Sequence, residues 1–359
     1  MIGKTSLKKH LRFTMIPEDK LLFICTRQNF LDTHKKAVID LCDREKINWE
    51  IVYATAKLHG VAPLIYLNLQ KCSGNGLIIP NDIANKFKLY LYTRKILEEK
   101  WEDYLKDALD FFHQRFIDVM LVKGVALNAL VYMHPWLVNK NDFDIIIRPG
   151  TNTPTSEEKS EIEDYIRSIK SKGIECDYFS HHDIICAEAL PIDFADIWKN
   201  ARKIHFLGYQ VYVMSPEYML IIACINAKRK RFFRLKSLFD IAEIINFYPD
   251  LNWKDFAMKA KKYRCNNLIY TALSVAKKTI GGYFPETVFK ELAVFPLRKL
   301  IIHLIIRYLN LRMSLSSLYP FSEENPMLRK TDLSLALPFA VFQLRDFWIK
   351  MLFRIRNIK

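Results

Sequence analysis

The alternation of apolar and polar positions predicts helices in both terminal parts of the chain and a small mixed unit between them. Apolar residues recur every three or four positions in Ile47–Gln70 and in the long amphipathic stretch Asn81–Arg115. Glycine, serine and proline in Lys71–Asp82 indicate a loop between these two helical segments. Residues 1–115 are therefore expected to form an N-terminal helical region.

The pattern changes at Phe116. The short apolar run FIDVMLVKG ends in Lys-Gly, and a helical pattern, VALNALVYM, follows it. Phe143–Ile147 has strand character, and Ser156–Gly173 is a helix with an acidic start and a glycine stop. The runs IECDYFS, IICAEA and LPIDFADIW are predicted as three short strands. Residues 116–213 are therefore expected to form a small mixed α/β core.

The helical pattern returns at Ser215. A serine, a proline and a glutamate in a row suit an N-cap, the first helical position and the first turn. We expect one helical region over residues 214–290 and a basic amphipathic helical region over residues 291–359. A small sheet embedded in helical flanks is an α+β fold.

Two stretches of the helical flanks resemble each other. Asn48–Tyr66 aligns without gaps to Asn252–Tyr270, with Asn-Trp, Ala-Lys and Leu-Ile-Tyr in common. Two copies do not make a solenoid. The sequence leaves open whether they are convergent amphipathic helices or a duplicated unit on the two sides of the core.

Composition and charge narrow the classes of partner. The 359 residues are 50% apolar and 26% charged, as in ordinary soluble globular proteins. The net charge of +15 favours polyanionic partners: nucleotides, nucleic acid or an anionic membrane surface. The seven cysteines are dispersed, without a CxxC pair, and indicate reduced thiols. Since neither a signal peptide nor an apolar run of about 18 residues is evident, we expect a cytoplasmic protein.

The candidate chemistry lies in the segment NKNDFDIIIRPG. Asp142 and Asp144 precede and begin an apolar strand, and side chains two positions apart lie on one face, roughly 7 Å apart. Two carboxylates so placed repel each other unless a cation lies between them. Oxygen ligands suit Mg²⁺ (or Mn²⁺). Asp193, in LPIDFADIW, is the candidate third carboxylate, with Asp196 as the alternative.

A candidate phosphate-binding turn precedes these acids. LVKGVALNAL combines a strand end, a Lys-Gly pair and a helix start. Amide groups at a helix N-terminus bind phosphate, and Gly124 would let a nucleotide approach closely. Lys123 would neutralise phosphate charge.

In these motifs and their order, the chain resembles the bacterial nucleotidyltransferase-family proteins of the DNA polymerase β-type superfamily. The flanking segments, such as NWEIVYATAKLHGVAPLIY, are also similar to that family, over roughly Ile47 to Pro285. The resemblance implies a polymerase β-like core. It also implies transfer of a nucleoside monophosphate from an NTP to a hydroxyl group, with Mg²⁺ (or Mn²⁺). Asp142 and Asp144 would be the metal-binding pair, Asp193 the third carboxylate, and Lys123 with Gly124 the phosphate turn.

The sequence does not identify the acceptor, which could be a small molecule, a protein or an RNA. The alternative is an inactive nucleotide-binding module that retains the fold. Lys228–Lys236, KRKRFFRLK, is either a phosphate-binding patch or a solvated helix end. The basic amphipathic stretch Leu344–Lys359 could contact a membrane, but docking on its own domain is favoured.

Overall fold

The N-terminal part of the chain is helical, as its sequence pattern predicts. The structure is a computed structural model, and it describes residues 16–74, 76–140, 142–149, 155–178, 192–230, 232 and 234–312. The stretch proposed for membrane contact or docking, Leu344–Lys359, lies outside these residues. The first five helices are α1 (Pro17–Cys25), α2 (Asp32–Arg44), α3 (Trp49–Leu58), α4 (Ala62–Ser73) and α5 (Asn81–Gln114).

A five-stranded mixed sheet forms the centre of the fold, with strand order β3-β2-β1-β5-β4. Its strands are β1 (Ile117–Leu121), β2 (Phe143–Pro149), β3 (Ile174–Tyr178), β4 (Arg202–Phe206) and β5 (Tyr209–Val213). Three helices connect them: α6 (Lys123–Leu130), α7 (Ser156–Lys170) and α8 (Phe194–Lys199). β2 runs antiparallel to β1 and parallel to β3. The expected α+β fold with a small mixed sheet is confirmed, and it is consistent with a polymerase β-like core.

The two faces of the sheet belong to different hydrophobic clusters. Phe143, Ile145 and Ile147 of β2 pack on one side with residues of α5 and α7. Ile146, between them in sequence, belongs to the larger cluster that holds the helical parts of the chain. Because side chains alternate along a strand, Asp142 and Asp144 lie on the same face as Ile146. The candidate site is therefore on the face opposite α5 and α7.

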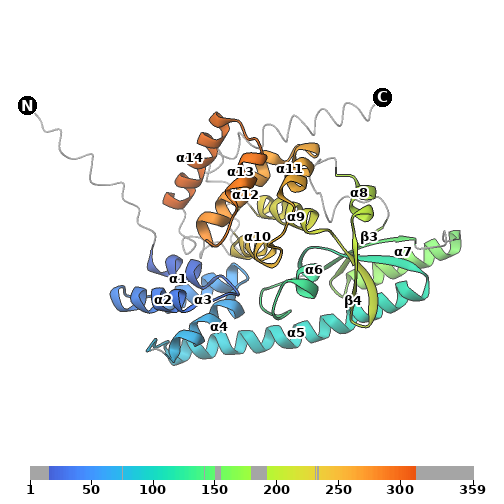
Figure 1. Ribbon diagram of the computed structural model, residues 1–359. Coiled ribbons are helices and arrows are strands. Elements are labelled where there is room, and N and C mark those ends of the chain that lie inside the picture. Colours follow the sequence, from blue (N-terminus) through green and yellow to red (C-terminus); the bar gives the residue numbers. More distant parts are fainter. Residues whose placement is uncertain are drawn as a thin grey trace, which may run out of the picture.

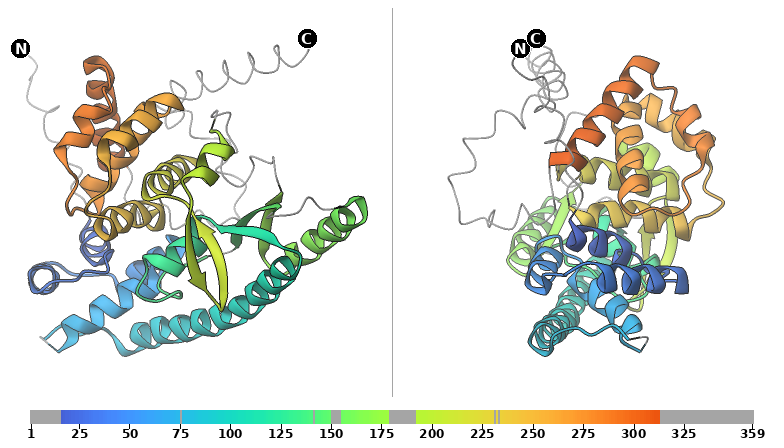
Figure 2. Two further views of the ribbon diagram at one scale, coloured as in Figure 1. Left: turned by 45° about the vertical axis from the view of Figure 1, so that its right-hand side comes forward. Right: turned by 90° about the vertical axis from the view of Figure 1, so that its left-hand side faces the viewer.

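Six helices complete the described chain, and Figure 1 shows them gathered on one side of α5. They are α9 (Pro216–Arg229), α10 (Leu235–Phe247), α11 (Trp253–Lys262), α12 (Asn266–Thr279), α13 (Glu286–Glu291) and α14 (Pro296–Arg312). The views of Figure 2 agree that α5 runs along the base of the molecule. In the described parts of the chain, we find no helix with the length and apolarity needed to cross a membrane. The domain boundaries at 115, 213 and 290 stay predictions.

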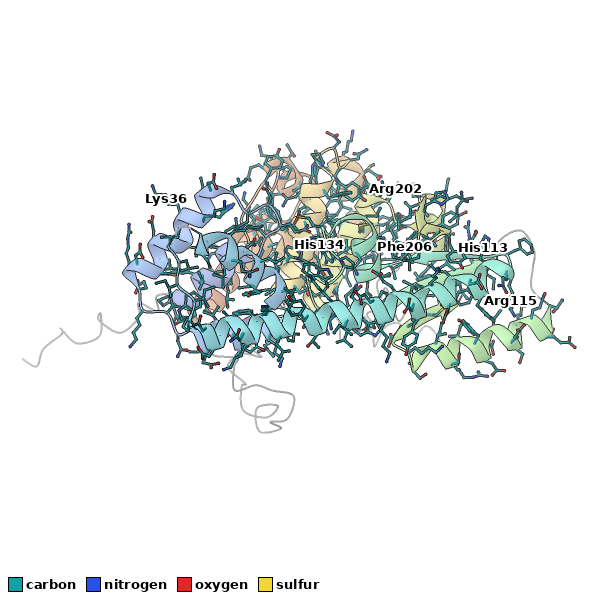
Figure 3. All side chains as sticks on the ribbon, turned by 90° about the horizontal axis from the view of Figure 1, so that it is seen from below. Lys36, His113, Arg115, His134, Arg202 and Phe206 are labelled. Atoms are coloured by element: carbon teal, nitrogen blue, oxygen red, sulfur yellow. The ribbon has the colours of Figure 1, made fainter. Side chains whose placement is uncertain are left out.

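α5 is joined to the far edge of the sheet through α7. Figure 3, seen from below, places Arg115 at the end of α5 beside α7. Its guanidinium donates to the Glu161 carboxylate of α7 and lies over the Phe111 ring. Phe111 in turn stacks on Tyr165 of α7 at 3.6 Å between ring centroids. The long helix α5 therefore supports the sheet at β1 and, through its contacts with α7, at β3.

The prediction of a strand at LPIDFADIW is wrong for the second half of that run. Residues Phe194–Lys199 form α8, because the Asp193 side chain accepts a hydrogen bond from the Ala195 amide and caps the helix. The run IICAEA lies outside the described residues. The last two strands come later, as the hairpin β4–β5, whose turn uses positive φ at Leu207 (51°) and Gly208 (90°). A two-residue turn of this kind matches the twist of the strands.

The two similar stretches form the same helix–turn–helix. Asn48 caps α3 and Asn252 caps α11, each accepting from the amide three residues later, at 3.3 and 3.0 Å. Each first helix ends in a left-handed residue, Gly60 (φ 73°) or Arg264 (φ 54°). α4 and α12 follow directly. This shared geometry favours a duplicated unit over convergent amphipathic helices, the two alternatives that the sequence left open.

Candidate metal and nucleotide site

The start of β2 places the two predicted aspartates at the edge of a buried strand. Asp142 is exposed, whereas Asp144 is only 5% exposed. The Asp144 carbonyl accepts a hydrogen bond from the Val122 amide at 3.1 Å. This bond fixes the aspartate strand to the residue that precedes Lys123. The sheet thus holds the carboxylates and the Lys-Gly segment in one place.

A third carboxylate joins them from the neighbouring strand. In the parallel ladder, Asp144 lies opposite Glu175 of β3. Carboxylate oxygens of Asp142, Asp144 and Glu175 lie within 4.8 Å of one another. Glu175 was not among the site residues predicted from the sequence. Its only signal was an acid in the otherwise strand-like run IECDYFS, and pairing between strands far apart in sequence is not visible in such a run.

The electrostatics of this cluster call for a cation. Burial raises the pKa of the Asp144 carboxyl to about 6, Lys123 opposes this shift, and the neighbouring Asp142 adds to it. The Lys123 ammonium lies 2.9 Å from an Asp144 oxygen. The three acidic side chains outnumber the one ammonium group that pairs directly with them. Hard oxygen ligands with excess negative charge suit Mg²⁺ or Mn²⁺, so the residues present fit such an ion.

The Lys-Gly segment begins a helix rather than a free turn. Lys123 is the first residue of α6 and has a left-handed φ of 50°. Such a conformation costs energy for a residue with a side chain and is often found at functional sites. Gly124 is not left-handed, and a Cβ there would meet only the Lys140 side chain, at an ordinary 3.4 Å. Packing alone therefore does not require glycine at position 124.

A buried polar network holds the loop that leads into the aspartates. The Lys140 ammonium, 4% exposed, forms an ion pair with the equally buried Glu98 of α5. Burial lowers the pKa of Lys140 to about 8 and raises the pKa of Glu98. Asn128 of α6 also donates to Glu98 at 3.0 Å, and Arg94 donates to the Lys140 carbonyl at 3.3 Å. The network ties α5, α6 and the aspartate loop together.

Lys230, directly after α9, lies near this site. Burial lowers the pKa of Lys230, as do neighbouring Arg234 and Arg229, while Asp142 acts in the opposite direction. Lys230 is thus within electrostatic reach of an aspartate of the cluster. Lys236 pairs with Asp240 at 2.8 Å. Lys236 and Asp240 line a pocket that is also lined by Lys123 and Gly124. The phosphate-binding patch at Lys228–Lys236 stays a prediction.

The structure places Asp193 and Asp196 at α8, outside the three-carboxylate group. Asp193 is exposed and caps the helix, directly after residues that are not described. Its role as third carboxylate stays a prediction. Asp196 accepts hydrogen bonds from the hydroxyls of Tyr218 (2.6 Å) and Tyr263 (2.9 Å) and pairs with Lys262. These three donors hold the pKa of Asp196 far below its usual range. Asp196 thus links α8 to α9 and α11.

Comparison with known proteins agrees with the resemblance in the motifs. Neither a curated protein nor a solved structure matches the chain. A protein family described as uncharacterised nucleotidyltransferase matches residues 45–281, which is more than half of the chain. The matched region begins before α3 and ends after α12, so it includes the sheet, the three carboxylates and both helix–turn–helix units. The chain therefore belongs to this nucleotidyltransferase family.

Proposed function

We propose that the protein transfers a nucleoside monophosphate from an NTP to a hydroxyl acceptor, with a divalent cation held by Asp142, Asp144 and Glu175. The observation that carries the proposal is the convergence of three carboxylates within 4.8 Å beside Lys123 and Gly124, in a chain of a nucleotidyltransferase family. Lys230, whose pKa Asp142 affects, adds positive charge near the cluster.

The bound cation would supply Lewis-acid stabilisation of charge on the triphosphate. The chain's own residues bind and orient the substrate. Lys123, at the start of α6, and Lys230 supply positive charge for the phosphate oxygens. Gly124 leaves the helix start without a side chain where the phosphates approach. β2 and β3 hold the acids rigidly, so little reorganisation is needed during the reaction.

In the transfer, the acceptor oxygen forms a bond to the α-phosphorus. The bond from that phosphorus to the bridging oxygen breaks, and pyrophosphate leaves. The acceptor proton passes to a carboxylate, which must lie within hydrogen-bond reach of the acceptor hydroxyl. We propose Asp193 for this role, on the basis of the sequence. Catalysis by positioning and charge neutralisation is typical of transfers of phosphoryl groups.

Label transfer tests the proposal. The purified protein is incubated with each [α-³²P]NTP, Mg²⁺ or Mn²⁺ and a cell lysate as the source of acceptors. We expect a labelled product with metal and none with EDTA. Asp144→Asn should lower the initial rate by about 100-fold or more, the range found when a charge-stabilising group is lost. The matched control is Asp103→Asn, an exposed aspartate of α5. Nucleotide binding without transfer to any acceptor would instead support the inactive binding module.

A further inference from the structure

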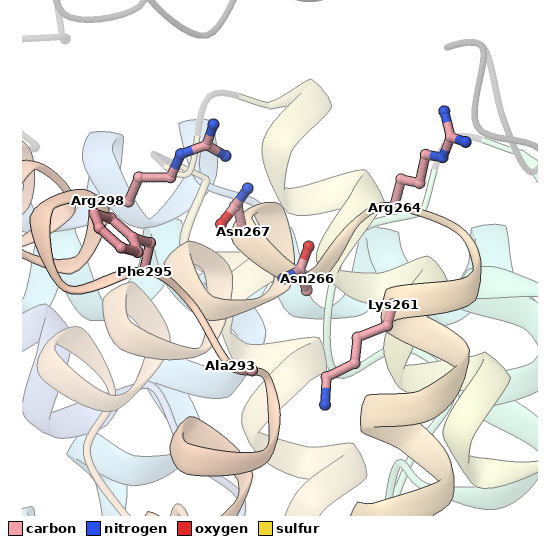
Figure 4. Close-up of a pocket in the computed structure, with 7 residues that line it drawn as sticks. All are labelled: Lys261, Arg264, Asn266, Asn267, Ala293, Phe295 and Arg298. Carbon is pink, nitrogen blue, oxygen red and sulfur yellow. The ribbon is translucent and has the colours of Figure 1, made fainter.

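A second basic pocket lies away from the carboxylates, in the C-terminal helices. It measures about 690 Å³, within the range of ligand sites in proteins. Figure 4 shows its lining, which comes from α11, the turn before α12, α12, the segment that joins α13 to α14, and the start of α14. The lining residues are Lys261, Arg264, Asn266, Asn267, Ala293, Phe295 and Arg298. None of them belongs to the site on β2, β3 and α6.

The charge of the pocket is one-sided. Lys261, Arg264 and Arg298 are all exposed, and in the described chain none of them forms an ion pair. The described lining contains no acidic residue. In Figure 4, Lys261 extends toward Ala293, and Arg264 and Arg298 lie on the two sides of the asparagines. Three cations without counter-charges favour an anion, and guanidinium groups suit phosphate because they can donate two parallel hydrogen bonds.

Neutral donors complete the set. Asn267 and Asn266 occupy the first turn of α12, and one amide hydrogen of Asn266 is used by the Leu292 carbonyl at 3.1 Å. α14 also begins at the pocket, with Arg298 in its first turn. The first amides of a helix have no intrahelical acceptor, and the helix dipole adds positive potential there. The two helix starts therefore add to the field of the three cations.

The repeated helix–turn–helix gives an independent reason to assign this pocket a role. In the first copy the left-handed position is Gly60, whose turn contacts the chain itself. The Gly60 carbonyl accepts from Asn139 at 2.8 Å, and a Cβ on Gly60 would lie 3.4 Å from Arg234. In the second copy the equivalent position is Arg264, which opens on the pocket. The second copy therefore presents an arginine side chain at the pocket, where the first copy has a glycine packed against its own chain.

An aromatic ring adds a second kind of contact. Phe295 lines the pocket and is 67% exposed. Exposed aromatic rings beside cations are the pattern of sites where a base stacks while its phosphate is neutralised. We infer that the pocket of Lys261, Arg264 and Arg298 binds a nucleotide phosphate, with Phe295 stacking on the base. The nucleotide is either free or part of a nucleic-acid strand. This inference does not rest on the proposed transfer reaction.

Binding measured in EDTA tests the inference without the metal site. The probes are a fluorescent nucleoside monophosphate and a fluorescein-labelled single-stranded RNA of about ten nucleotides, the length of a typical single-strand site. The variant carries Lys261→Gln, Arg264→Gln and Arg298→Gln. The control carries Lys88→Gln, Lys106→Gln and Lys159→Gln, which are exposed lysines of α5 and α7. Both variants change the net charge equally, and thermal melting checks that each is folded.

We expect the pocket variant to lose affinity by about tenfold or more while the control stays near the wild type, because charge-assisted contacts are lost only in the pocket. Phe295→Ala should weaken both base-containing probes but leave inorganic pyrophosphate competition unchanged. If the pocket variant loses binding of the monophosphate, the ligand is a free nucleotide. If it loses binding of the RNA alone, the ligand is a nucleic-acid strand. Equal weakening in the two triple variants, or no binding of either probe by the wild type, would overturn the inference.

Discussion

Asp144 and Glu175 lie directly opposite each other in the parallel ladder between β2 and β3. Their carboxylates therefore share one face of the sheet, and Asp142 brings a third set of oxygens to within 4.8 Å. Neighbouring like charges, one of them buried, are unfavourable without a counter-ion. The register of one pair of strands thus determines which acids can share a metal.

The identity of the third carboxylate can be decided by two matched substitutions. We expect Glu175→Gln to weaken Mn²⁺ binding by about tenfold or more, because it removes the negative charge of one carboxylate ligand. Asp193→Asn should reduce turnover with little effect on Mn²⁺ binding if its role is to accept the acceptor's proton. Titration of the Mn²⁺ electron paramagnetic resonance signal measures the affinities. Weakened binding in Asp193→Asn with unchanged binding in Glu175→Gln would assign the ligand to Asp193 instead.

Gly124→Ala separates nucleotide approach from folding. The added Cβ meets only the Lys140 side chain, at 3.4 Å, and alanine in a helix is favoured over glycine by up to about 1 kcal/mol. We expect unchanged or slightly raised stability in urea unfolding, with a weakened affinity for NTP. Gly74→Ala is the control, since its Cβ would meet nothing within 4 Å. An NTP affinity equal to that of the wild type would remove Gly124 from the phosphate site.

The buried pair of Lys140 and Glu98 should be a major determinant of stability. Lys140→Met leaves the Glu98 carboxylate buried without its cation, which typically costs about 3–5 kcal/mol. Adding Glu98→Gln should recover part of the loss. Lys86→Met, which breaks the exposed pair with Glu50, should cost far less, because water screens exposed ion pairs. Urea unfolding compares the three variants. Equal costs for the buried and exposed pairs would show that the network does not hold the aspartate loop.

Asp196 gives the fold an acid-sensitive link. Its folded pKa is lower than its unfolded pKa, chiefly through Lys262 and Tyr218, so its contribution is present above about pH 4 and is lost as pH falls further. Asp196→Asn should destabilise the protein by about 1.5–3 kcal/mol at pH 7, the range for hydrogen bonds to a charged group. The difference from wild type should shrink toward pH 3. A difference in denaturation midpoint that stays constant with pH would contradict this account.

Sequence reasoning located the aspartate pair because strand periodicity is local. Asp142 and Asp144 stand two positions apart before a run of isoleucines, which is enough to place them on one face. Glu175 could not be found in this way, because its relation to Asp144 depends on the pairing of β2 with β3. The helix at Phe194 was predicted as a strand from its apolar alternation, although aspartate is a residue type that often begins helices, as Asp193 does here.

The helical flanks were predictable for a similar reason. The 3.6-residue period of α5 and the capping asparagines of α3 and α11 are local signals. The buried Lys140 and the left-handed Arg264 were not, since both depend on contacts that form only in the folded chain. A lysine is unusual in a buried position, and an arginine is unusual in a left-handed conformation. Tertiary interactions decide such positions.

The central claim is that Asp142, Asp144 and Glu175 hold one divalent cation against the phosphates of an NTP. The most direct test is a crystal structure with Mn²⁺ and a non-hydrolysable NTP analogue, with the ion located by anomalous scattering. The account predicts an anomalous peak about 2.0–2.3 Å from oxygens of all three side chains, with phosphate oxygens among the remaining ligands. A bound nucleotide whose metal lies elsewhere, with the three carboxylates uncoordinated, would contradict it.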